Sequence, residues 1–555
     1  MEAARTKKRR GSTKGRQVDA GALSRVRRVL GDAPRQRDLL IENLHLIQDE
    51  FGHLSAAHLA ALASEMRLPM AEVFEVATFY HHFDVVREGA AAPPSVTVRV
   101  CESLSCEMAG SQALLKKLCD TLGAEVRVKS APCVGRCAMA PVAVVHQNPI
   151  EHATVDKVAV AVSSGQTGCK LAPYIDYRSY RKQGGYRLLW RCLRDRFDRE
   201  ELFRMMDEAG LRGLGGAGFP VGQKWRIVWN QAAPRLMAVN IDEGEPGTFK
   251  DRHFLERDPH RFIEGMLVAA WATGCSEIFV YVRDEYAGCR AILEKELSAL
   301  KAEPPCALPV IHLRRGAGAY ICGEESAMIE SIEGKRGMPR LRPPYVAEVG
   351  LFGRPTLEHN METCFWIRDI VDNGPDWFAG HGRRDRKGLR SFSVSGRVNK
   401  PGVHVAPAGI TARELIDEYC DGMQDGHEFY AYLPGGASGG ILPASMGDIA
   451  LDFDTLDAYG CFIGSAAVIV LSDHDKAWSA ARNLMHFFHD ESCGQCTPCR
   501  VGTAKALALV EDDNWDTQLL EELSRVMADA SICGLGQAAP NPLLSVMKYF
   551  PKELK

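Results

Sequence analysis

The chain has 555 residues and a mass of 61.0 kDa, which is too long for one hydrophobic core, since single cores stop growing near about 250–300 residues. Its net charge of −4 argues against nucleic acid as a partner. No apolar stretch reaches the ~20 residues that span a bilayer, and no apolar segment follows the basic start as in a secretory signal. We therefore expect a cytoplasmic protein of several domains, without membrane insertion.

The first third of the chain predicts a tail and two small domains. Residues 1–22 are basic and polar and are expected to be disordered. Apolar residues recur at helical spacing over 23–92, where Ser55 is a predicted helix N-cap. Residues 93–163 predict a small α/β unit. Its expected elements are a helix at 111–122 and strands at 95–100, 126–128 and 142–145.

The remaining chain predicts a linker and three larger domains. Residues 164–209 are expected to form a linker that includes an amphipathic helix. An α/β domain follows at 210–385, a β-rich module at 386–473 and a helical domain at 474–555. The predicted strands of the α/β domain lie at 236–239, 278–282 and 310–313.

Eighteen cysteines are the most informative residues of the chain. Cys493, Cys496 and Cys499 have the spacing C-x2-C-x2-C, and Cys533 lies further on. Three thiolates at two-residue gaps can bind one face of a cubane, and a distant fourth completes it, so this set predicts a 4Fe–4S cluster. Structural zinc is the alternative, although zinc sites more often show two separated pairs.

A second set consists of Cys101, Cys106, Cys133 and Cys137. Each pair follows a predicted strand, so we expect loops at one end of a small sheet to hold all four thiolates. Such a set suits a 2Fe–2S cluster or tetrahedral zinc, and the C-x4-C gap favours iron. The ten cysteines outside both sets have no close cysteine partner and are predicted to be buried apolar side chains.

A glycine-rich segment at 213–225 offers a phosphate site. Gly213, Gly215 and Gly216 let the backbone approach a ligand and free amide N–H groups for an anion. Lys224 adds a positive charge. The segment lacks the register of the dinucleotide fingerprint, and an ordinary turn is the alternative.

Acidic turns follow two of the predicted strands. The turn at 240–252 contains Asp242, Glu243 and Glu245 at the end of a strand, where open α/β sheets bind ligands. Carboxylates there suit hydrogen bonds to ribose hydroxyls or an isoalloxazine ring, and a solvated acidic loop is the alternative. The turn at 316–325 repeats the pattern with glycines, an aromatic residue and two acids.

These motifs together resemble the flavin-bearing, NADH-oxidising subunit of respiratory complex I, whose relatives serve NAD-dependent hydrogenases and formate dehydrogenases. The region 23–163 is similar to the small thioredoxin-like 2Fe–2S subunit of complex I, which favours 2Fe–2S over zinc there. The fused arrangement is most similar to the β (diaphorase) subunit of NAD-dependent molybdenum or tungsten formate dehydrogenase. The segments that carry the resemblance are 213–225, 240–252, 316–340, 394–402, 433–440 and 493–499, with Cys533.

The resemblance implies an α/β multidomain fold. It consists of an N-terminal helical plus thioredoxin-like domain, an FMN-binding Rossmann-like α/β domain, a β-grasp-like module and a C-terminal helical iron–sulfur domain. The implied cofactors are FMN, NAD, one 2Fe–2S cluster on Cys101, Cys106, Cys133 and Cys137, and one 4Fe–4S cluster on Cys493, Cys496, Cys499 and Cys533.

The resemblance also assigns residues to the nucleotides. Glu243 is expected to lie close to the flavin and tune it electrostatically, with no side chain acting as acid or base. The sequence departs from the family at Leu214 (usually Arg), His359 (usually Asn) and Tyr345 (usually Phe). The implied FMN contacts are Gly213, Gly215, Gly216, Lys224, Asn240, Asp242, Tyr320, Gly323, Asn360 and Thr363. The implied NAD contacts are Phe219, Lys224, Glu245, Glu325 and Tyr345.

The implied function is that of an NAD(H)-oxidoreductase subunit in a formate dehydrogenase complex. A larger molybdenum- or tungsten-pterin α subunit with further iron–sulfur clusters would oxidise formate, and electrons would reach FMN and reduce NAD⁺ reversibly. The alternative is the same module in an NAD-reducing hydrogenase or a complex I-like NADH dehydrogenase. A non-catalytic iron–sulfur protein without flavin and a zinc-stabilised binding protein are competing hypotheses, which bound FMN and iron would eliminate.

Overall fold

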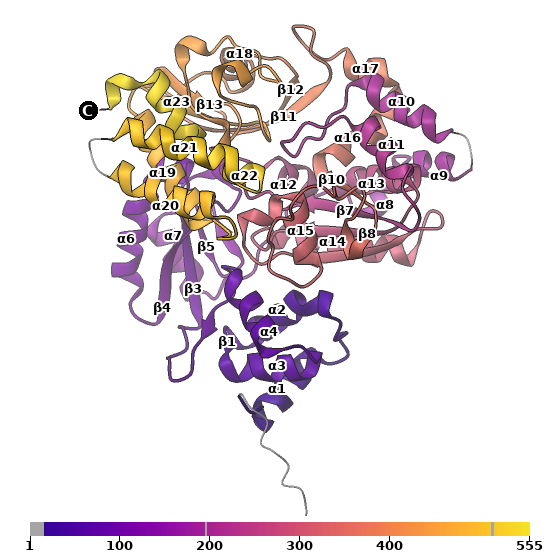
Figure 1. Cartoon of the computed structure of the whole chain (residues 1–555), viewed down its shortest axis with the longest axis vertical. Helices are drawn as coiled ribbons and strands as arrows, with labels where there is room; N and C mark the ends of the chain where they lie inside the picture. Colours follow the sequence, from indigo (N-terminus) through magenta and orange to yellow (C-terminus); the bar gives the residue numbers. More distant parts are fainter. Residues whose placement is uncertain (1–15, 195–196, 512–514, 555) are drawn as a thin grey trace, which may run out of the picture. The chain divides into compact units, whose positions relative to one another are not determined.

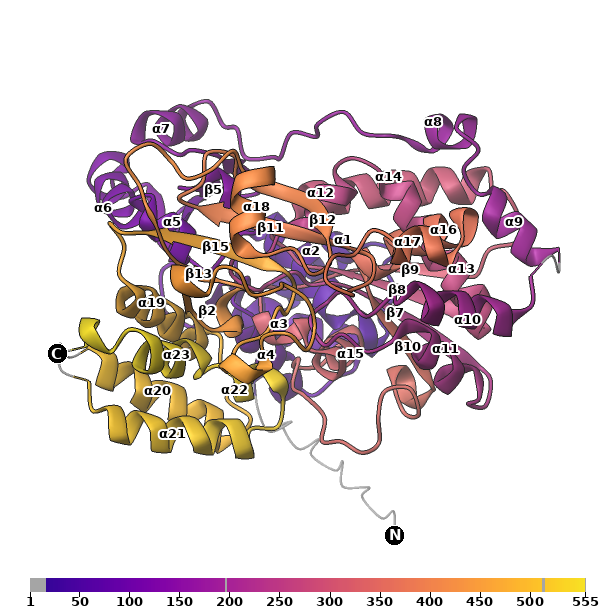
Figure 2. The same ribbon diagram turned by 90° about the horizontal axis from the view of Figure 1, so that it is seen from above.

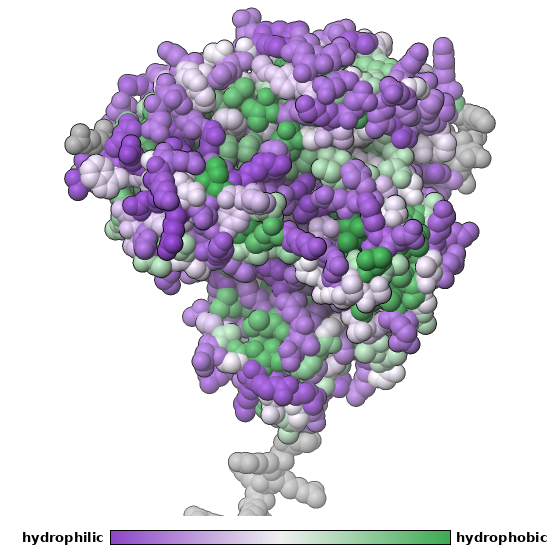
Figure 3. Space-filling view, turned by 180° about the vertical axis from the view of Figure 1, so that it is seen from behind, coloured by the Kyte–Doolittle hydropathy of each residue, from purple (hydrophilic) through white to green (hydrophobic). Residues whose placement is uncertain are grey.

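The computed structural model describes residues 16–194, 197–511 and 515–554 and divides into two compact units, 1–93 and 94–555 (Figure 1). The predicted basic tail lies outside the described residues up to position 15, and the first helix begins at Ala20 with Asp19 as its N-cap. Among the described residues, no helix combines the length and apolarity that crossing a membrane requires. Hydrophilic residues cover most of the face drawn in Figure 3, and hydrophobic ones form small separate groups.

The first unit is helical, as predicted. Ser55 caps its third helix by accepting a 3.1 Å hydrogen bond from the backbone N–H of His58. A short parallel pair, β1 with β2, completes the unit. Its elements are α1 (Ala20–Leu30), α2 (Leu40–Phe51), β1 (Leu54–Ser55), α3 (Ala56–Met66), α4 (Met70–Phe79) and β2 (Val85–Val86).

The second unit begins with a four-stranded sheet in the order β4-β3-β5-β6. Strand β3 pairs in parallel with β4 and antiparallel with β5. Val98, Val100, Leu114 and Leu118 pack in its core, which places α6 against the sheet. The elements are β3 (Val96–Cys101), α5 (Leu104–Met108), α6 (Ser111–Leu122), β4 (Val126–Ala131), β5 (Ala143–Val145), β6 (Asn148–Ile150) and α7 (Val155–Ser163).

The segment predicted as a linker with one helix contains three: α8 (Tyr177–Lys182), α9 (Arg187–Leu193) and α10 (Arg199–Ala209). Tyr180, Tyr186 and Phe203 from these helices are buried in the same core as Phe262 of the following domain. The short length of α8 and α9 explains why helical periodicity did not reveal them. The part before α8 runs as an extended connection (Figure 2).

A four-stranded parallel sheet forms the centre of the next domain, in the order β10-β7-β8-β9. Strands β7, β8 and β9 follow each other across the sheet, and β10 returns to the other side of β7. The order therefore reverses between β7 and β10. The elements are α11 (Val221–Trp229), β7 (Arg235–Ile241), α12 (Lys250–Leu255), α13 (Pro259–Thr273), β8 (Cys275–Val282), α14 (Ala287–Ala302), β9 (Val310–Arg315), α15 (Glu325–Ile332), β10 (Thr356–Asn360), α16 (Met361–Asn373) and α17 (Pro375–Ala379).

A five-stranded sheet and a helical region complete the chain. The sheet order is β12-β11-β15-β13-β14, with β11 and β15 parallel. Sequence analysis missed helix α18, whose start is fixed by a capping box between Thr411 and Glu414. The elements are β11 (Leu389–Gly396), β12 (Gly402–Pro407), α18 (Ala412–Tyr419), β13 (Phe429–Leu433), β14 (Leu442–Pro443), β15 (Ala467–Ser472), α19 (Ala477–Asp490), α20 (Thr497–Glu511), α21 (Thr517–Ala530), α22 (Gly534–Ala538) and α23 (Asn541–Tyr549).

Candidate redox centres and flavin site

Four cysteines meet at one edge of the first sheet of the second unit. Cys101 ends β3, Cys106 lies on α5, and Cys133 and Cys137 lie in the loop after β4. Because β3 and β4 are parallel and Cys101 pairs with Ala131, both loops leave the same edge. All four thiols are buried, and the sulfurs of Cys133 and Cys137 lie 3.3 Å apart.

The surroundings of these thiols suit a metal cluster. The backbone N–H of Gly135 points at the Cys133 sulfur from 3.5 Å. Hydrogen bonds from Cys101 and Cys137 lower the pKa of the Cys133 thiol, and the Arg283 guanidinium lowers it further. A buried all-thiol donor set with an amide aimed at sulfur fits a 2Fe–2S cluster.

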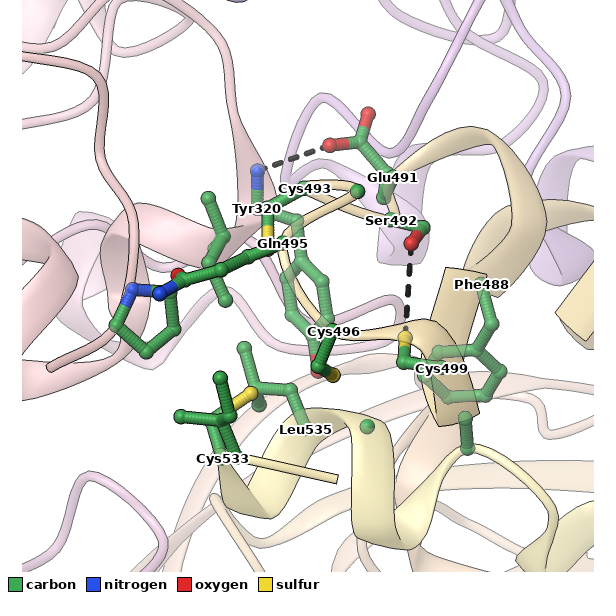
Figure 4. A pocket seen from close by; sticks show the side chains of 16 residues that line it. Tyr320, Phe488, Glu491, Ser492, Cys493, Gln495, Cys496, Cys499, Cys533 and Leu535 are labelled. Atoms are coloured by element: carbon green, nitrogen blue, oxygen red, sulfur yellow. Dashed lines mark hydrogen bonds between the residues drawn. The ribbon is translucent and has the colours of Figure 1, made fainter. Parts of the chain in front are cut away.

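The second cysteine set lines a cavity in the C-terminal helical region (Figure 4). Cys493 and Cys496 precede α20, Cys499 lies in its first turn, and Cys533 is the N-cap residue of α22. Burial raises the pKa of the Cys533 thiol to about 12. Burial also raises the pKa of the Cys493 and Cys499 thiols. Four thiols that line one cavity fit an iron–sulfur cluster.

The rest of this cavity is lined mostly by apolar side chains, together with Gln495 and the residues of two polar contacts. Ile321, Phe488 and Leu535 contribute to its walls. The Ser492 hydroxyl lies 3.5 Å from the Cys499 sulfur. The backbone N–H of Tyr320 donates a 2.9 Å hydrogen bond to the Glu491 carboxylate, as Figure 4 shows. Tyr320 therefore joins the turn after β9 to the iron–sulfur region.

The predicted flavin contacts gather where the strand order of the parallel sheet reverses. Asn240 is the next-to-last residue of β7, Asn360 is the last residue of β10, and the two are direct partners across these strands. The carboxyl ends of strands at such a switch point form the crevice in which open α/β sheets bind ligands. The Asn240 side chain also donates to the carbonyl of Gly323, 2.9 Å away, so the turn after β9 reaches the same place.

The glycine-rich segment packs against this crevice. The Gly213 N–H donates to the carbonyl of Phe219 at 2.8 Å and closes the turn. Gly216 and Gly218 have positive φ angles of 129° and 65°, which side chains disfavour. A Cβ on Gly215 would lie only 3.0 Å from the Asn360 Cβ, so glycine permits the close approach.

Leu214, where the family usually has arginine, is buried and does not extend into the crevice. Its N–H donates to the Thr363 hydroxyl at 2.9 Å, so Thr363 fastens the glycine turn to α16. Leu214 thus brings no positive charge to the expected site, and its backbone keeps the turn anchored.

Lys224 lies on α11, one turn inside the helix, instead of in the glycine turn itself. Its ammonium donates to the Glu358 carbonyl at 3.1 Å and lies 3.9 Å from the Glu358 carboxylate. Burial raises the pKa of Glu358 to about 7, and Lys224 opposes this rise. Sequence analysis missed Glu358, although the two-residue period of a strand places it on the same face as Asn360.

Asp242 has the properties of a ligand-binding carboxylate. Burial raises its pKa to about 8. Its backbone N–H is held by the Asn240 side chain at 3.0 Å, yet no described residue donates a hydrogen bond to its carboxylate. A Cβ on Gly323 would lie 3.1 Å from the Asp242 carbonyl. A half-buried carboxylate acceptor beside a glycine-lined crevice fits a bound flavin.

Glu243 and Glu245 turn toward other parts of the protein. The Glu243 carboxylate accepts from the Asp251 N–H at 2.8 Å and from the Tyr286 hydroxyl at 2.7 Å. The Glu245 carboxylate accepts from the Ser438 N–H at 2.7 Å and from the Tyr320 hydroxyl. The expected roles of Glu243 on the flavin and Glu245 on NAD therefore compete with structural hydrogen bonds.

The structure does not join the remaining expected NAD contacts into one cluster. Phe219 and Tyr345 are exposed to 41% and 55%. Glu325 pairs with Arg342 at 3.1 Å. Aromatic faces open to solvent can receive a planar ligand, whereas Glu325 would have to leave Arg342 to contact one.

The comparisons with known proteins agree with this division of the chain. Residues 206–369 match the Nuo51 FMN-binding domain, 26–165 the thioredoxin-like [2Fe-2S] ferredoxin and 479–555 the NADH-ubiquinone oxidoreductase-F iron–sulfur binding region. An NADH-quinone oxidoreductase subunit of Rhizobium meliloti (strain 1021) is 40% identical over 390 residues, which are 68% of this chain and 92% of the relative. The chain belongs to the Nuo51 family of FMN-binding NADH-quinone oxidoreductase subunits.

Members of this family serve different assemblies. NADP-reducing hydrogenase subunit HndC of Solidesulfovibrio fructosivorans is 38% identical over 368 residues, 64% of this chain and 75% of the relative. A chain in the crystal structure of an NAD⁺-reducing [NiFe]-hydrogenase in the H₂-reduced state aligns with a TM-score of 0.83 and 30% identity over 94% of both chains.

These matches confirm the predicted fold class and cofactor domains. The chain is an FMN- and iron–sulfur-dependent NADH dehydrogenase module, with a thioredoxin-like 2Fe–2S domain fused to the FMN-binding domain and the 4Fe–4S region.

Proposed function

We propose that this module exchanges a hydride with NAD(H) at the crevice between β7 and β10 and passes electrons singly to a partner protein. The observation that supports this best is the pairing of Asn240 with Asn360 at the point where strand order reverses. When bound, FMN supplies two-electron exchange with NAD(H) and one-electron exchange with iron–sulfur clusters.

The side chains of the crevice bind and orient, and none acts as a nucleophile. Gly213, Gly215 and Gly216 form the phosphate turn, with Lys224 as its cation. Asp242 and Asn360, together with Asn240 and Gly323, would hold the bound FMN. Thr363 contributes by holding the glycine turn through Leu214, and Tyr320 by holding the turn after β9 through Glu491. Phe219 and Tyr345 offer faces for the NAD rings, with Glu245 and Glu325 beside them.

The eight clustered cysteines carry the electron path of the proposal. Cys493, Cys496, Cys499 and Cys533 bind the 4Fe–4S cluster, which Tyr320 separates from the acidic turn after β7. Cys101, Cys106, Cys133 and Cys137 bind the 2Fe–2S cluster, and Arg283 connects Cys133 to the same turn. Burial of all four cysteines keeps water from the 2Fe–2S site, and side chains such as Ile321, Phe488 and Leu535 limit access to the half-buried 4Fe–4S site.

The partner proposed first is the catalytic subunit of a hydrogenase or of a complex I-like assembly. The likeness over 94% of both chains to an NAD⁺-reducing hydrogenase chain supports this alternative better than formate dehydrogenase. A molybdenum- or tungsten-pterin subunit that oxidises formate is the second candidate, suggested by the resemblance of the fused sequence.

One experiment separates these partners. The chain is tagged in its native host, purified anaerobically with its complex and given NAD⁺ with either hydrogen or formate. NADH formation from hydrogen supports the first partner, and formation from formate supports the second. A complex that contains neither flavin nor NADH-dependent activity with an artificial acceptor contradicts the proposal as a whole.

A further inference from the structure

Two buried arginines connect the Cys133–Cys137 loop to the acidic turn after β7. Arg283 follows β8 and is only 5% exposed, and Arg252 on α12 is 8% exposed. Neither was singled out by sequence analysis. A buried guanidinium is costly unless its donors are satisfied, so the partners of these two residues are informative.

Arg283 bridges the two segments directly. One terminal nitrogen donates to the Cys133 carbonyl at 2.8 Å, and the other donates to the Glu243 carbonyl. Its Nε donates to Glu285 at 3.0 Å, so all three nitrogens are engaged. One side chain thus holds a proposed 2Fe–2S ligand and the turn of the flavin crevice.

Arg252 repeats the connection two residues further along the loop. Its Nε donates to the Gly135 carbonyl at 2.9 Å. Its backbone N–H lies 3.3 Å from the Glu243 carboxylate, and its guanidinium also binds Glu256 at 2.7 Å. Arg252 therefore also links the loop to the residues around Glu243.

The loop itself is shaped to receive these contacts. Gly135 has a φ of 69°, and a Cβ there would collide with the ring of Tyr286. The Tyr286 hydroxyl donates to Glu243 at 2.7 Å. The contact with the Tyr286 ring and the hydrogen bonds from both arginines therefore hold the Cys133–Cys137 loop in one conformation.

We propose that Arg283 is a positioning residue that fixes the Cys133–Cys137 loop and raises the reduction potential of the 2Fe–2S cluster. Reduction adds a negative charge to the cluster, and a buried cation stabilises that charge because the protein interior screens it weakly. Because the same guanidinium also donates to the Glu243 carbonyl, its position relative to the cluster depends on the conformation of the acidic turn after β7. This inference rests on the cluster ligands proposed above.

The test is a potentiometric titration of the whole purified chain, followed by electron paramagnetic resonance of each cluster. Arg283→Met should move the 2Fe–2S midpoint potential to a more negative value and leave the 4Fe–4S potential unchanged. Arg283→Lys retains the charge but has a shorter side chain, so its 2Fe–2S potential should lie between those of Arg283→Met and the wild type. Arg390→Met is the matched control, because Arg390 is also buried and donates to Asp452 and to the Leu389 carbonyl.

The outcomes separate this inference from the proposed function. Selective loss of the 2Fe–2S signal in Arg283→Met, with partial recovery in Arg283→Lys, supports the positioning role. Two results overturn it. One is full iron content in both the Met and Lys variants, with the 2Fe–2S potential and g values of the wild type. The other is a Lys variant with the wild-type 2Fe–2S potential while the Met variant holds no 2Fe–2S cluster. Absence of any 2Fe–2S signal in the wild-type chain contradicts the ligand assignment instead.

Discussion

The indole Nε1–H of Trp225 donates a 2.7 Å hydrogen bond to Nε2 of His359, and both side chains are buried. This contact joins α11 to β10 beneath the proposed flavin crevice. It gives His359, a departure from the pattern that the resemblance implies, a defined structural partner. Burial lowers the pKa of His359 well below its ordinary value, and the nearby Lys224 adds to this effect.

His359 should make the protein less stable in mild acid. The unfolded chain takes up a proton near pH 6.5 and the folded chain does not, so folding stability falls as the pH drops below about 6.5. His359→Asn should remove this part of the loss. Urea unfolding midpoints at pH 7.5 and 5.5 measure this loss of stability. In the control His474→Asn, at an exposed histidine, the difference between the two midpoints should equal that of the wild type. A pH response in His359→Asn equal to that of the wild type would show that His359 is not held neutral.

Gly323→Ala should weaken flavin binding. The added Cβ would meet the Asp242 carbonyl at 3.1 Å and push the turn away from Asn240. Gly168 has open space around it, so Gly168→Ala is the matched control. We expect the alanine at 323 to lower the flavin content of the purified chain by about tenfold, equivalent to about 1.4 kcal/mol. Fluorescence of the released flavin measures this, and equal content in both variants would move the site elsewhere.

Tyr320→Phe should cost more stability than an ordinary tyrosine-to-phenylalanine change. The Tyr320 hydroxyl donates to the half-buried carboxylate of Glu245, whereas the Tyr432 hydroxyl donates to a neutral carbonyl of Met446 at 3.0 Å. Hydrogen bonds to charged groups contribute about 1.5–3 kcal/mol, against about 0.5–1.5 kcal/mol for neutral ones. Urea unfolding of both variants compares them, and a larger loss in Tyr432→Phe would contradict the assigned contact.

The two cysteine sets should lose iron independently. Cys496→Ser should leave about two of the about six irons per chain, and Cys133→Ser should leave about four, since one site binds a 4Fe–4S and the other a 2Fe–2S cluster. Cys169→Ser, outside both sets, should retain all of them. Iron and labile sulfide analysis provides the numbers. Zinc in place of iron at either set would revive the alternative considered from spacing.

The sequence predicted what depends on short-range pattern. The spacing of Cys493, Cys496 and Cys499 and the strand before Asp242 are local signals, and the structure places them at the cavity and at a strand end. The order of the strands is not local, so the pairing of Asn240 with Asn360 became visible only in the folded chain.

The contacts that hold the centres together were beyond sequence reasoning for the same reason. Arg283 contacts Cys133 across 150 positions of the chain. A charged residue directly after a strand is common on protein surfaces, so the local sequence around Arg283 does not indicate a buried contact. Glu243 was expected to face the flavin because of its place in the motif, whereas its carboxylate is occupied by Tyr286 and backbone N–H groups.

The measurement that tests the central claim most directly is an anaerobic titration of the purified chain with NADH, followed by visible absorbance and electron paramagnetic resonance. The account predicts that NADH bleaches a bound flavin and that the reduced iron–sulfur signals appear with it. A chain that carries both clusters but binds no flavin, or whose flavin and clusters stay oxidised under excess NADH, would contradict it.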